Sequence, residues 1–217
     1  MPLPGRPAFA LLEFGSVSAG LSTVDAMLKR SPVALLRCGS VHPGRYLALV
    51  GGSVASTEEA HAAGVTAGCA QNALLDDALL ADPHPRLADA VVGERATPRG
   101  DAVGVCEVST SPSLLRALDR VLKSMPIHLV EVRLADDLGG RALAVFDGDL
   151  PDVQEALGAI TDHLRDPERP GDVGRLLASS VIPRLDETLR DVLSEGTRFG
   201  ACANWTPAGA EILETEG

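Results

Sequence analysis

Few side chains in this 217-residue chain have the types and spacing that chemistry requires. His42 lies in a short segment rich in Gly and Pro, where an imidazole could bind a metal ion or accept a proton. The sequence contains no G-x-S-x-G, H-E-x-x-H or G-x-x-x-x-G-K-[ST] motif, and no G-x-G-x-x-G after an expected strand. The remaining histidines are isolated from one another in sequence; they are His61, His84, His128 and His163. We therefore expect no catalytic residues and no enzymatic activity.

Two adjacent carboxylates, Asp136 and Asp137, are the second feature that could support chemistry. Paired carboxylates can act as general acid and base or bind a cation. Asp-Asp followed closely by Gly is also common in turns, because aspartate caps its own backbone there. The turn interpretation is the simpler one.

The four cysteines are scattered along the chain without C-x-x-C spacing. Neither a zinc knuckle nor a disulfide framework follows from such a distribution. We expect buried or unreactive thiols, since free cysteine commonly behaves as a small core residue. The four are Cys38, Cys69, Cys106 and Cys202.

Composition excludes several classes of partner. Hydrophobic residues make up 45% and charged residues 23%, which is typical of a folded protein. The net charge of -11 and an aromatic content of 3% argue against nucleic acid, which requires a basic surface and rings for base stacking. No stretch approaches the roughly 20 apolar residues of a membrane span, and residues 1–7 lack the apolar core of a secretory signal. We expect a cytoplasmic protein with no membrane partner.

The chain repeats itself, and this repeat determines the expected architecture. Three pairs of identical residues recur 94 positions apart, and after a two-residue insertion Gly44-Arg45 aligns with Gly140-Arg141. Insertions belong in loops, so residues 40–44 and 134–140 should form loops that differ between the copies. The three pairs are Glu13 with Glu107, Asp25 with Asp119 and Lys29 with Lys123.

Hydrophobic periodicity predicts the same elements in each half: a strand, a helix, a hairpin, a second helix, a final strand and a tail. The expected strands are 9–14, 33–38 and 45–50 in the first half and 102–108, 127–133 and 141–146 in the second. The second helices should span about 54–69 and 151–164. We predict a first domain at 8–92, a polar linker at 93–101, a second domain at 102–195 and a C-terminal extension at 196–217, which contains Trp205.

Four motifs stand out in this repeat: an opening strand that ends in glutamate, the Asp-Ala-Met-Leu-Lys segment at 25–29, a glycine-containing loop, and the Ser-Val-Ile-Pro-Arg segment at 180–184. With these motifs, the two halves resemble the bacterial microcompartment (BMC) shell domain over residues 9 to 193. The order of elements is similar to the non-permuted tandem class, of the propanediol-utilisation type. The resemblance implies an α/β (α+β) fold with two tandem domains, each an antiparallel sheet flanked by helices. It also implies a trimer that imitates the hexagon of single-domain shell proteins.

The resemblance further implies residues at the edge of such a tile. Lys29 and Lys123 match a lysine that contacts the adjoining tile, and Arg184 matches an arginine that assists there. Arg86, in the segment His84-Pro85-Arg86, is matched to the same arginine in the first half. The alternative is that all four are solvated surface charges.

In tandem shell proteins the first loop lines the threefold axis, which places Ser40, Val41, His42, Pro43 and Gly44 at a pore. The second loop, which contains Asp136, Asp137, Leu138 and Gly139, should lie farther from the axis. A propanediol-type member carries an iron-sulfur cluster on a cysteine at this point, but that position is His42 here, so we expect no such cluster. We predict no cofactor and a polar pore lining, with a metal ion on three His42 rings as the alternative.

The expected function is therefore a structural shell tile with a pore for small metabolites. The expected partners are two further copies of the chain, single-domain hexamers and pentameric vertex proteins, in the shell of a microcompartment. Two alternatives remain open: a metal or electron conduit through the pore, and a trimeric regulator that binds a small molecule.

Overall fold

The first half of the chain forms a four-stranded antiparallel sheet around β1 (Ala8–Phe14), whose seven residues are all buried. The structure is a computed structural model that describes residues 7–135, 137–165 and 173–198. β1 pairs with β3 (Arg45–Gly52) on one side and with β4 (Leu74–Leu80) on the other, and β2 (Ala34–Val41) completes the order β2-β3-β1-β4. The apolar run of β1 thus follows from its central position, where both faces are covered.

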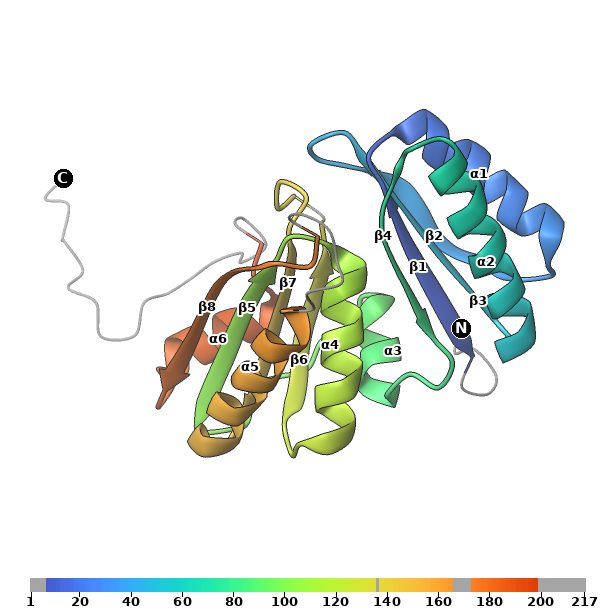
Figure 1. Cartoon of the computed structure of the whole chain (residues 1–217). Coiled ribbons are helices and arrows are strands. Elements are labelled where there is room, and N and C mark those ends of the chain that lie inside the picture. The colour runs from blue at the N-terminus through green and yellow to red at the C-terminus, as the bar shows by residue number, and fades with distance from the viewer. Residues whose placement is uncertain (1–6, 136, 166–172, 199–217) are drawn as a thin grey trace, which may run out of the picture.

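Two helices, α1 (Val17–Arg30) and α2 (Val54–Ala70), pack against each other and against this sheet (Figure 1). Each begins at a serine whose side chain accepts a hydrogen bond from the first turn, Ser16 for α1 and Ser53 for α2. Gly64 allows α2 to approach the sheet closely, because a Cβ there would lie 2.7 Å from Leu12 Cδ2. The α1 helix ends at Arg30, before Pro32, as the sequence predicts.

The second half repeats this order of elements. Its sheet has the order β6-β7-β5-β8, which is equivalent to that of the first half (Figure 1). Glu13 pairs with Leu47 of β3, and Glu107 pairs with Leu143 of β7, so the two glutamates occupy the same place in the two sheets. The tandem α/β architecture expected from the repeat is confirmed. The elements are β5 (Ala102–Val108), α4 (Ser111–Ser124), β6 (His128–Leu134), β7 (Ala142–Gly148), α5 (Leu150–Leu164) and β8 (Leu176–Pro183).

Each half closes with a short helix that the periodicity did not reveal, α3 (Pro85–Val91) and α6 (Glu187–Glu195). Both begin at a capping side chain, His84 for α3 and Asp186 for α6. The α3 helix has seven residues, which is too short for its periodicity to stand out. It packs against β6 of the second half and buries Leu87 completely.

One of the hydrophobic core clusters spans both halves, and each half also has a cluster of its own. α4 of the second half packs against β4 and β1 of the first, and one buried cluster contains Leu11 and Leu80 together with Leu115 and Leu118. The connecting residues follow the second half closely: Ala96 N donates to Val130 O at 3.0 Å. The contact between the halves is therefore an interior surface of the chain.

Candidate pore loops and assembly surfaces

The first expected pore loop connects β2 to β3. Ser40 and Val41 are the last residues of β2, and His42, Pro43 and Gly44 form the exposed turn. Gly44 has φ of +88°, which glycine adopts readily, and its N–H donates to Val41 O at 3.0 Å. The His42 side chain is thus carried on a tight, glycine-closed turn.

The second expected loop connects β6 to β7, and Asp136 lies outside the described residues. Asp137 and Gly139 are exposed, and both have positive φ, 59° and 61°. Arg141 N donates to Leu138 O at 3.2 Å and closes the turn. The aspartate and glycine therefore serve a tight backbone turn here, as the turn interpretation expects.

The two loops touch within the chain. Arg45 Nη1 donates to Gly140 O at 3.0 Å. A Cβ at Gly140 would lie 3.0 Å from Pro43 Cδ and 3.2 Å from His42 O. Both expected pore loops therefore lie at the same end of the molecule.

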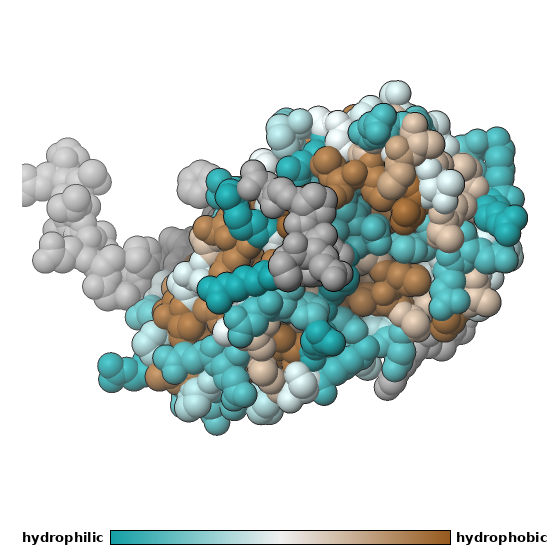
Figure 2. Space-filling view, viewed as in Figure 1, coloured by the Kyte–Doolittle hydropathy of each residue, from teal (hydrophilic) through white to brown (hydrophobic). Residues whose placement is uncertain are grey.

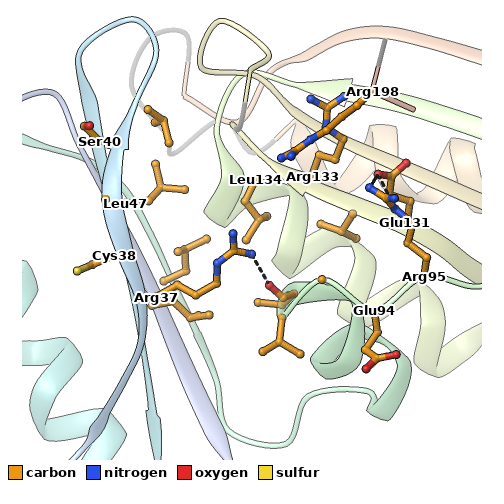
Figure 3. A pocket seen from close by; sticks show the side chains of 18 residues that line it. Arg37, Cys38, Ser40, Leu47, Glu94, Arg95, Glu131, Arg133, Leu134 and Arg198 are labelled. Carbon is orange, nitrogen blue, oxygen red and sulfur yellow. Dashed lines mark hydrogen bonds and ion pairs between the residues drawn. The ribbon is translucent and has the colours of Figure 1, made fainter. Parts of the chain in front are cut away.

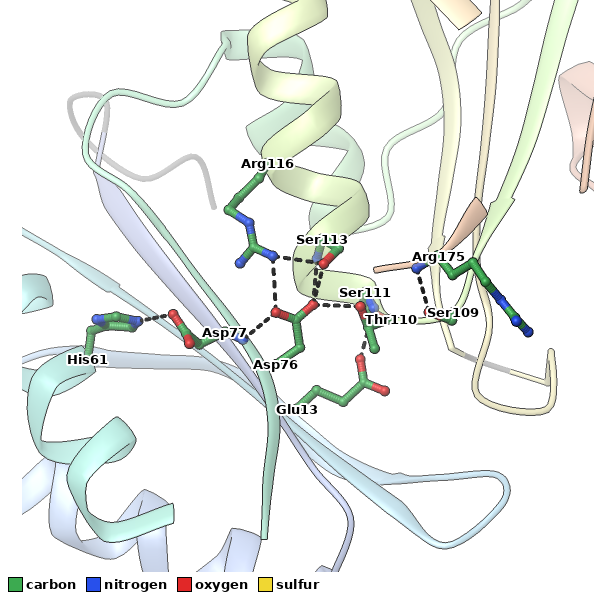
Figure 4. Close-up of polar contacts among 10 residues, drawn as sticks. All are labelled: Glu13, His61, Asp76, Asp77, Ser109, Thr110, Ser111, Ser113, Arg116 and Arg175. Carbon is green, nitrogen blue, oxygen red and sulfur yellow. Dashed lines mark hydrogen bonds and ion pairs between the residues drawn. The ribbon is translucent and has the colours of Figure 1, made fainter. Parts of the chain in front are cut away.

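Beside these loops, two carboxylates of the first half cap a helix of the second (Figure 4). Glu13 Oε2 accepts from Ser111 N at 2.8 Å, at the start of α4, and Glu13 Oε1 binds Arg45 Nη1 at 2.6 Å. Glu13 is fully buried, and burial raises its pKa above the ordinary value, although the bonds from Ser111 and Arg45 oppose that shift. Arg45 also donates to Ser109 O at 2.9 Å, so the pair joins the two halves.

Asp76 on β4 is the second capping carboxylate. It accepts from Ser113 N at 3.0 Å, from Ser113 Oγ at 2.6 Å and from Thr110 Oγ1 at 2.5 Å. Arg116 Nη2 binds its other oxygen at 3.0 Å. Burial alone would raise the pKa of Asp76, but the Arg116 charge and the bonds from Ser113 and Thr110 hold it below its ordinary value. Free N–H groups at a helix N-terminus favour anions, which explains why both carboxylates point there.

The sequence did not assign a role to this capping pair. Glu13 entered only as an anchor of the repeat, and Asp76 has no acidic counterpart: the strand registers place Ala178 at its position in the second half. Asp76 lies 37 residues from Ser113 in the sequence. The sequence did contain a signal for this role. Asp76 is acidic where the second half has an alanine, and a carboxylate on a mostly apolar strand needs a hydrogen-bond or charge partner.

The expected edge lysines lie in different surroundings. Lys29 Nζ binds Asp25 at 2.5 Å, and the Lys29 side chain is 74% exposed. Lys123 Nζ binds Asp119 at 2.6 Å and also donates to the backbone carbonyl of Asp82 in the first half. The Lys123 side chain is 41% exposed. Both remain accessible to an adjoining molecule, although Lys123 also helps to join the two halves.

Arg86 makes hydrogen bonds to the second half of the chain. Arg86 Nε donates to Leu129 O at 2.9 Å, and Nη2 donates to Val130 O at 3.2 Å, so Arg86 is bound between the two halves. The strand registers place Asp82, rather than Arg86, at the position equivalent to Arg184. The edge role of Arg86 stays a prediction, although the strand register does not support the match of its Pro-Arg segment to that of Arg184. Arg184 itself is exposed directly after β8.

The helix face that α4 buries is exposed on the equivalent helix α1. Leu115 and Leu122 of α4 are 0% and 6% exposed, whereas their counterparts on α1, Leu21 and Leu28, are 54% and 39% exposed. For the last strand of each half, the exposure is reversed: β4 of the first half is covered by α4, and β8 of the second is more exposed. Asp76 of β4, which binds α4, is buried, whereas its counterpart Ala178 on β8 is exposed.

The first half thus exposes a helix face and the second half exposes the strand surface that such a face covers. Figure 2 shows apolar surface on both halves of the molecule, interrupted by hydrophilic side chains. Within a single chain these two surfaces do not meet: α1 packs against α2 and its own sheet, and β8 packs against β5 and α5.

Among the described residues, no group of three or more His, Cys, Asp and Glu side chains is arranged to hold a metal ion. No helix in the part of the chain that the structure describes has the length and apolar character needed to cross a membrane. Cys106 is buried, which raises its pKa to about 12, as expected for an unreactive thiol. Cys38 and Cys69 are exposed, contrary to a core role, and Cys202 lies outside the described residues.

Comparison with known proteins gives consistent relatives. The family model "BMC domain" matches residues 8–83 and 102–185. The bacterial microcompartment shell protein PduT of Citrobacter freundii is 32% identical over 189 residues, 87% of this chain and 98% of PduT. The carboxysome assembly protein CcmO of Synechocystis sp. is 27% identical over 206 residues, 89% of this chain and 67% of CcmO.

Solved structures agree with these relatives. A microcompartment protein from Desulfitobacterium hafniense DCB matches with a TM-score of 0.72 and 29% identity, over 86% of this chain and 99% of that chain. A fused permuted shell protein matches with a TM-score of 0.50 and 16% identity, which is a likeness of fold. With both halves matched by the family model, this chain belongs to the bacterial microcompartment shell proteins and carries two BMC domains in tandem.

Proposed function

We propose that this chain is a structural tile of a microcompartment shell that closes as a homotrimer around a central pore. The observation that carries the proposal is the exposure of Leu21 and Leu28 on α1, whose counterparts on α4 are buried between the halves. An exposed apolar face on one half and its complementary strand surface on the other form a head-to-tail interface between chains.

The second observation concerns Glu107 and Arg141, the counterparts of Glu13 and Arg45. Arg141 Nη1 binds Glu107 Oε2 at 3.0 Å, and the Glu107 side chain is 34% exposed. In the trimer, Glu107 would accept from the N–H of Val17 in the next chain, as Glu13 accepts from Ser111 N. Three copies of this contact and three contacts between halves would close a ring of six domains.

The loop with His42 would line the pore of this tile, with the second loop beside it and farther from the axis, since the two loops touch within each chain. An exposed His42 and the polar backbone of two glycine-closed turns favour the passage of small polar metabolites. A metal ion held by three His42 side chains is the alternative for the same position. No catalytic arrangement enters this proposal, and the relatives PduT and CcmO are named as shell and assembly proteins.

Tiles of this kind would assemble edge to edge with copies of the chain and with other shell proteins, through Lys29, Lys123 and Arg184. The test has two parts. Analytical ultracentrifugation should give the mass of three chains, and electron microscopy of concentrated protein should show flat hexagonal layers. A monomer at every concentration would refute the tile, and a discrete trimer that forms no layers, alone or with single-domain shell proteins, would favour the regulator.

A further inference from the structure

A cavity of about 440 Å³ opens between the two halves, on the side of the sheets where α3 lies. One wall consists of β2 and β3 of the first half, and the other of β6 and the residues that follow α3. Figure 3 shows Arg37 of β2 reaching across this space towards the end of α3, where its Nη1 donates to Val91 O at 3.4 Å. The volume falls in the range of small-molecule sites, about 300 to 1,000 Å³.

The lining carries an excess of positive charge in a chain of net charge -11. Four arginines line the cavity, against two glutamates. Glu131 and Arg95 neutralise each other, since Arg95 Nη2 lies 2.8 Å from Glu131 Oε1, so the excess comes from the other three arginines. Glu94 points away from the guanidinium groups in Figure 3. The four arginines are Arg37, Arg95, Arg133 and Arg198.

The surroundings of Arg133 show that this charge is crowded. Burial lowers the pKa of Arg133, and the charges of Arg198 and Arg95 lower it further, against the opposing effects of Glu131 and Asp137. Figure 3 shows Arg133 and Arg198 on the same side of the cavity. An anion placed between the two walls would offset this repulsion.

The rest of the lining is apolar. Leu11, Leu47 and Leu49 cover the wall of the first half, and Leu134 faces them from the second. The side chains of Cys38 and Ser40 point to the other side of β2 in Figure 3 and leave the leucines in contact with the cavity. A ligand that fits must therefore combine an anionic group with a short apolar body.

Guanidinium groups bind carboxylates and phosphates through two parallel hydrogen bonds, which suits a cavity with arginines on both walls. We propose that this cavity between the halves is a binding site for a small organic anion, a carboxylate or a phosphate monoester with a short apolar chain. The proposal does not depend on the trimer, because every residue of the site belongs to one chain. It extends the tile function, since β2 leads directly into the loop that contains His42.

The experiment is isothermal titration of the full chain at low ionic strength with butyrate and, separately, with butyl phosphate. Sodium chloride and the neutral analogue butyramide are the reference titrants. We expect saturable binding at one site per chain for at least one of the two anions, and the stronger anion identifies the acidic group. Butyramide should bind at least about tenfold more weakly, because it lacks the charge that the arginines recognise.

Arg37→Gln is the variant, since the hydrogen bond of Arg37 to Val91 O is long and its loss should leave the fold intact. Arg30→Gln is the matched control: it removes the same charge from the exposed end of α1. Arg37→Gln should weaken anion binding about tenfold or more, while Arg30→Gln should leave it unchanged. Absence of saturable binding for both anions, or equal weakening by the two variants, would overturn the proposal. Sedimentation of the same samples reports separately on the trimer.

Discussion

Glu13 and Glu107 occupy equivalent positions on the central strands of the two sheets, but their surroundings differ. Glu13 is fully buried and accepts a hydrogen bond from the first N–H of α4. Glu107 is partly exposed and binds Arg141 beside an uncovered strand surface. The glutamate of the first half therefore caps a helix within the chain, whereas the glutamate and arginine of the second half face outward.

The trimer interface can be tested at Leu21. Leu21→Asp should abolish the trimer and leave a folded monomer, because Leu21 is 54% exposed in the chain but would be buried between chains. Val54→Asp is the control: Val54 is also exposed, and it begins α2, whose counterpart α5 contacts chiefly its own half. Ultracentrifugation and circular dichroism measure the two properties. A trimeric Leu21→Asp protein would contradict the interface.

The contact between the halves can be tested at Asp76. Asp76→Ala should lower the free energy of unfolding by about 3 kcal/mol, because it leaves Arg116 and the start of α4 without their buried anion. Asp25→Ala, which breaks the exposed i,i+4 pair with Lys29, should cost at most about 0.5 kcal/mol. Urea unfolding of both variants measures the difference, and equal costs would show that the buried pair adds no stability.

The two capping carboxylates predict opposite effects of pH. The pKa of Asp76 is lowered from 3.8, so its stabilising contribution is present above pH 3.8 and is lost as pH falls through the lowered pKa. The pKa of Glu13 is raised from 4.5, so its contribution is present below pH 4.5 and is lost as pH rises through the raised pKa.

Consequently, the stability difference between the unmodified chain and Asp76→Asn should grow as pH rises towards 3.8 and stay constant above that value. The difference between the unmodified chain and Glu13→Gln should shrink as pH rises above 4.5. Urea midpoints measured from pH 3 to pH 7 give both slopes. Parallel slopes for the two variants would rule out this assignment of the buried carboxylates.

Assembly between tiles can be tested at the lysines. Lys29→Ala combined with Lys123→Ala should leave the trimer intact but abolish hexagonal layers in electron microscopy, because both ammonium groups are accessible in the chain. Arg165→Ala removes a similarly exposed charge at the end of α5 and should not affect the layers. Unchanged layers in the double variant would refute the edge role.

The pore position can be tested at His42. If the pore lining is polar and His42 binds no metal, protein purified without a histidine tag should contain far less than one metal ion per trimer by elemental analysis. His42→Ala should then change neither the metal content nor the trimer, because the His42 side chain is exposed. One zinc or similar ion per trimer that disappears in His42→Ala would replace the polar lining with the metal alternative.

Much of the fold could be predicted from the sequence because its signals are local or repeated. Short stretches of chain determine three of these features: the apolar run of β1, the ends of α1 and α4 before proline, and the loops at the insertion. The 94-residue repeat added the tandem arrangement, since equal patterns fold into equal units. The strand register disagrees with one alignment made from the sequence, because Asp82 rather than Arg86 takes the place equivalent to Arg184.

Only the tertiary structure decided which of two equivalent surfaces is covered. Glu13 reaches a helix that begins 98 residues later, and Asp76 reaches the same helix from another strand. Such contacts depend on how one half packs against the other, and no local pattern records that packing. The same holds for the arginine-lined cavity, whose walls come from strands of different halves. Sequence determined the two units, and their packing against each other determined the sites.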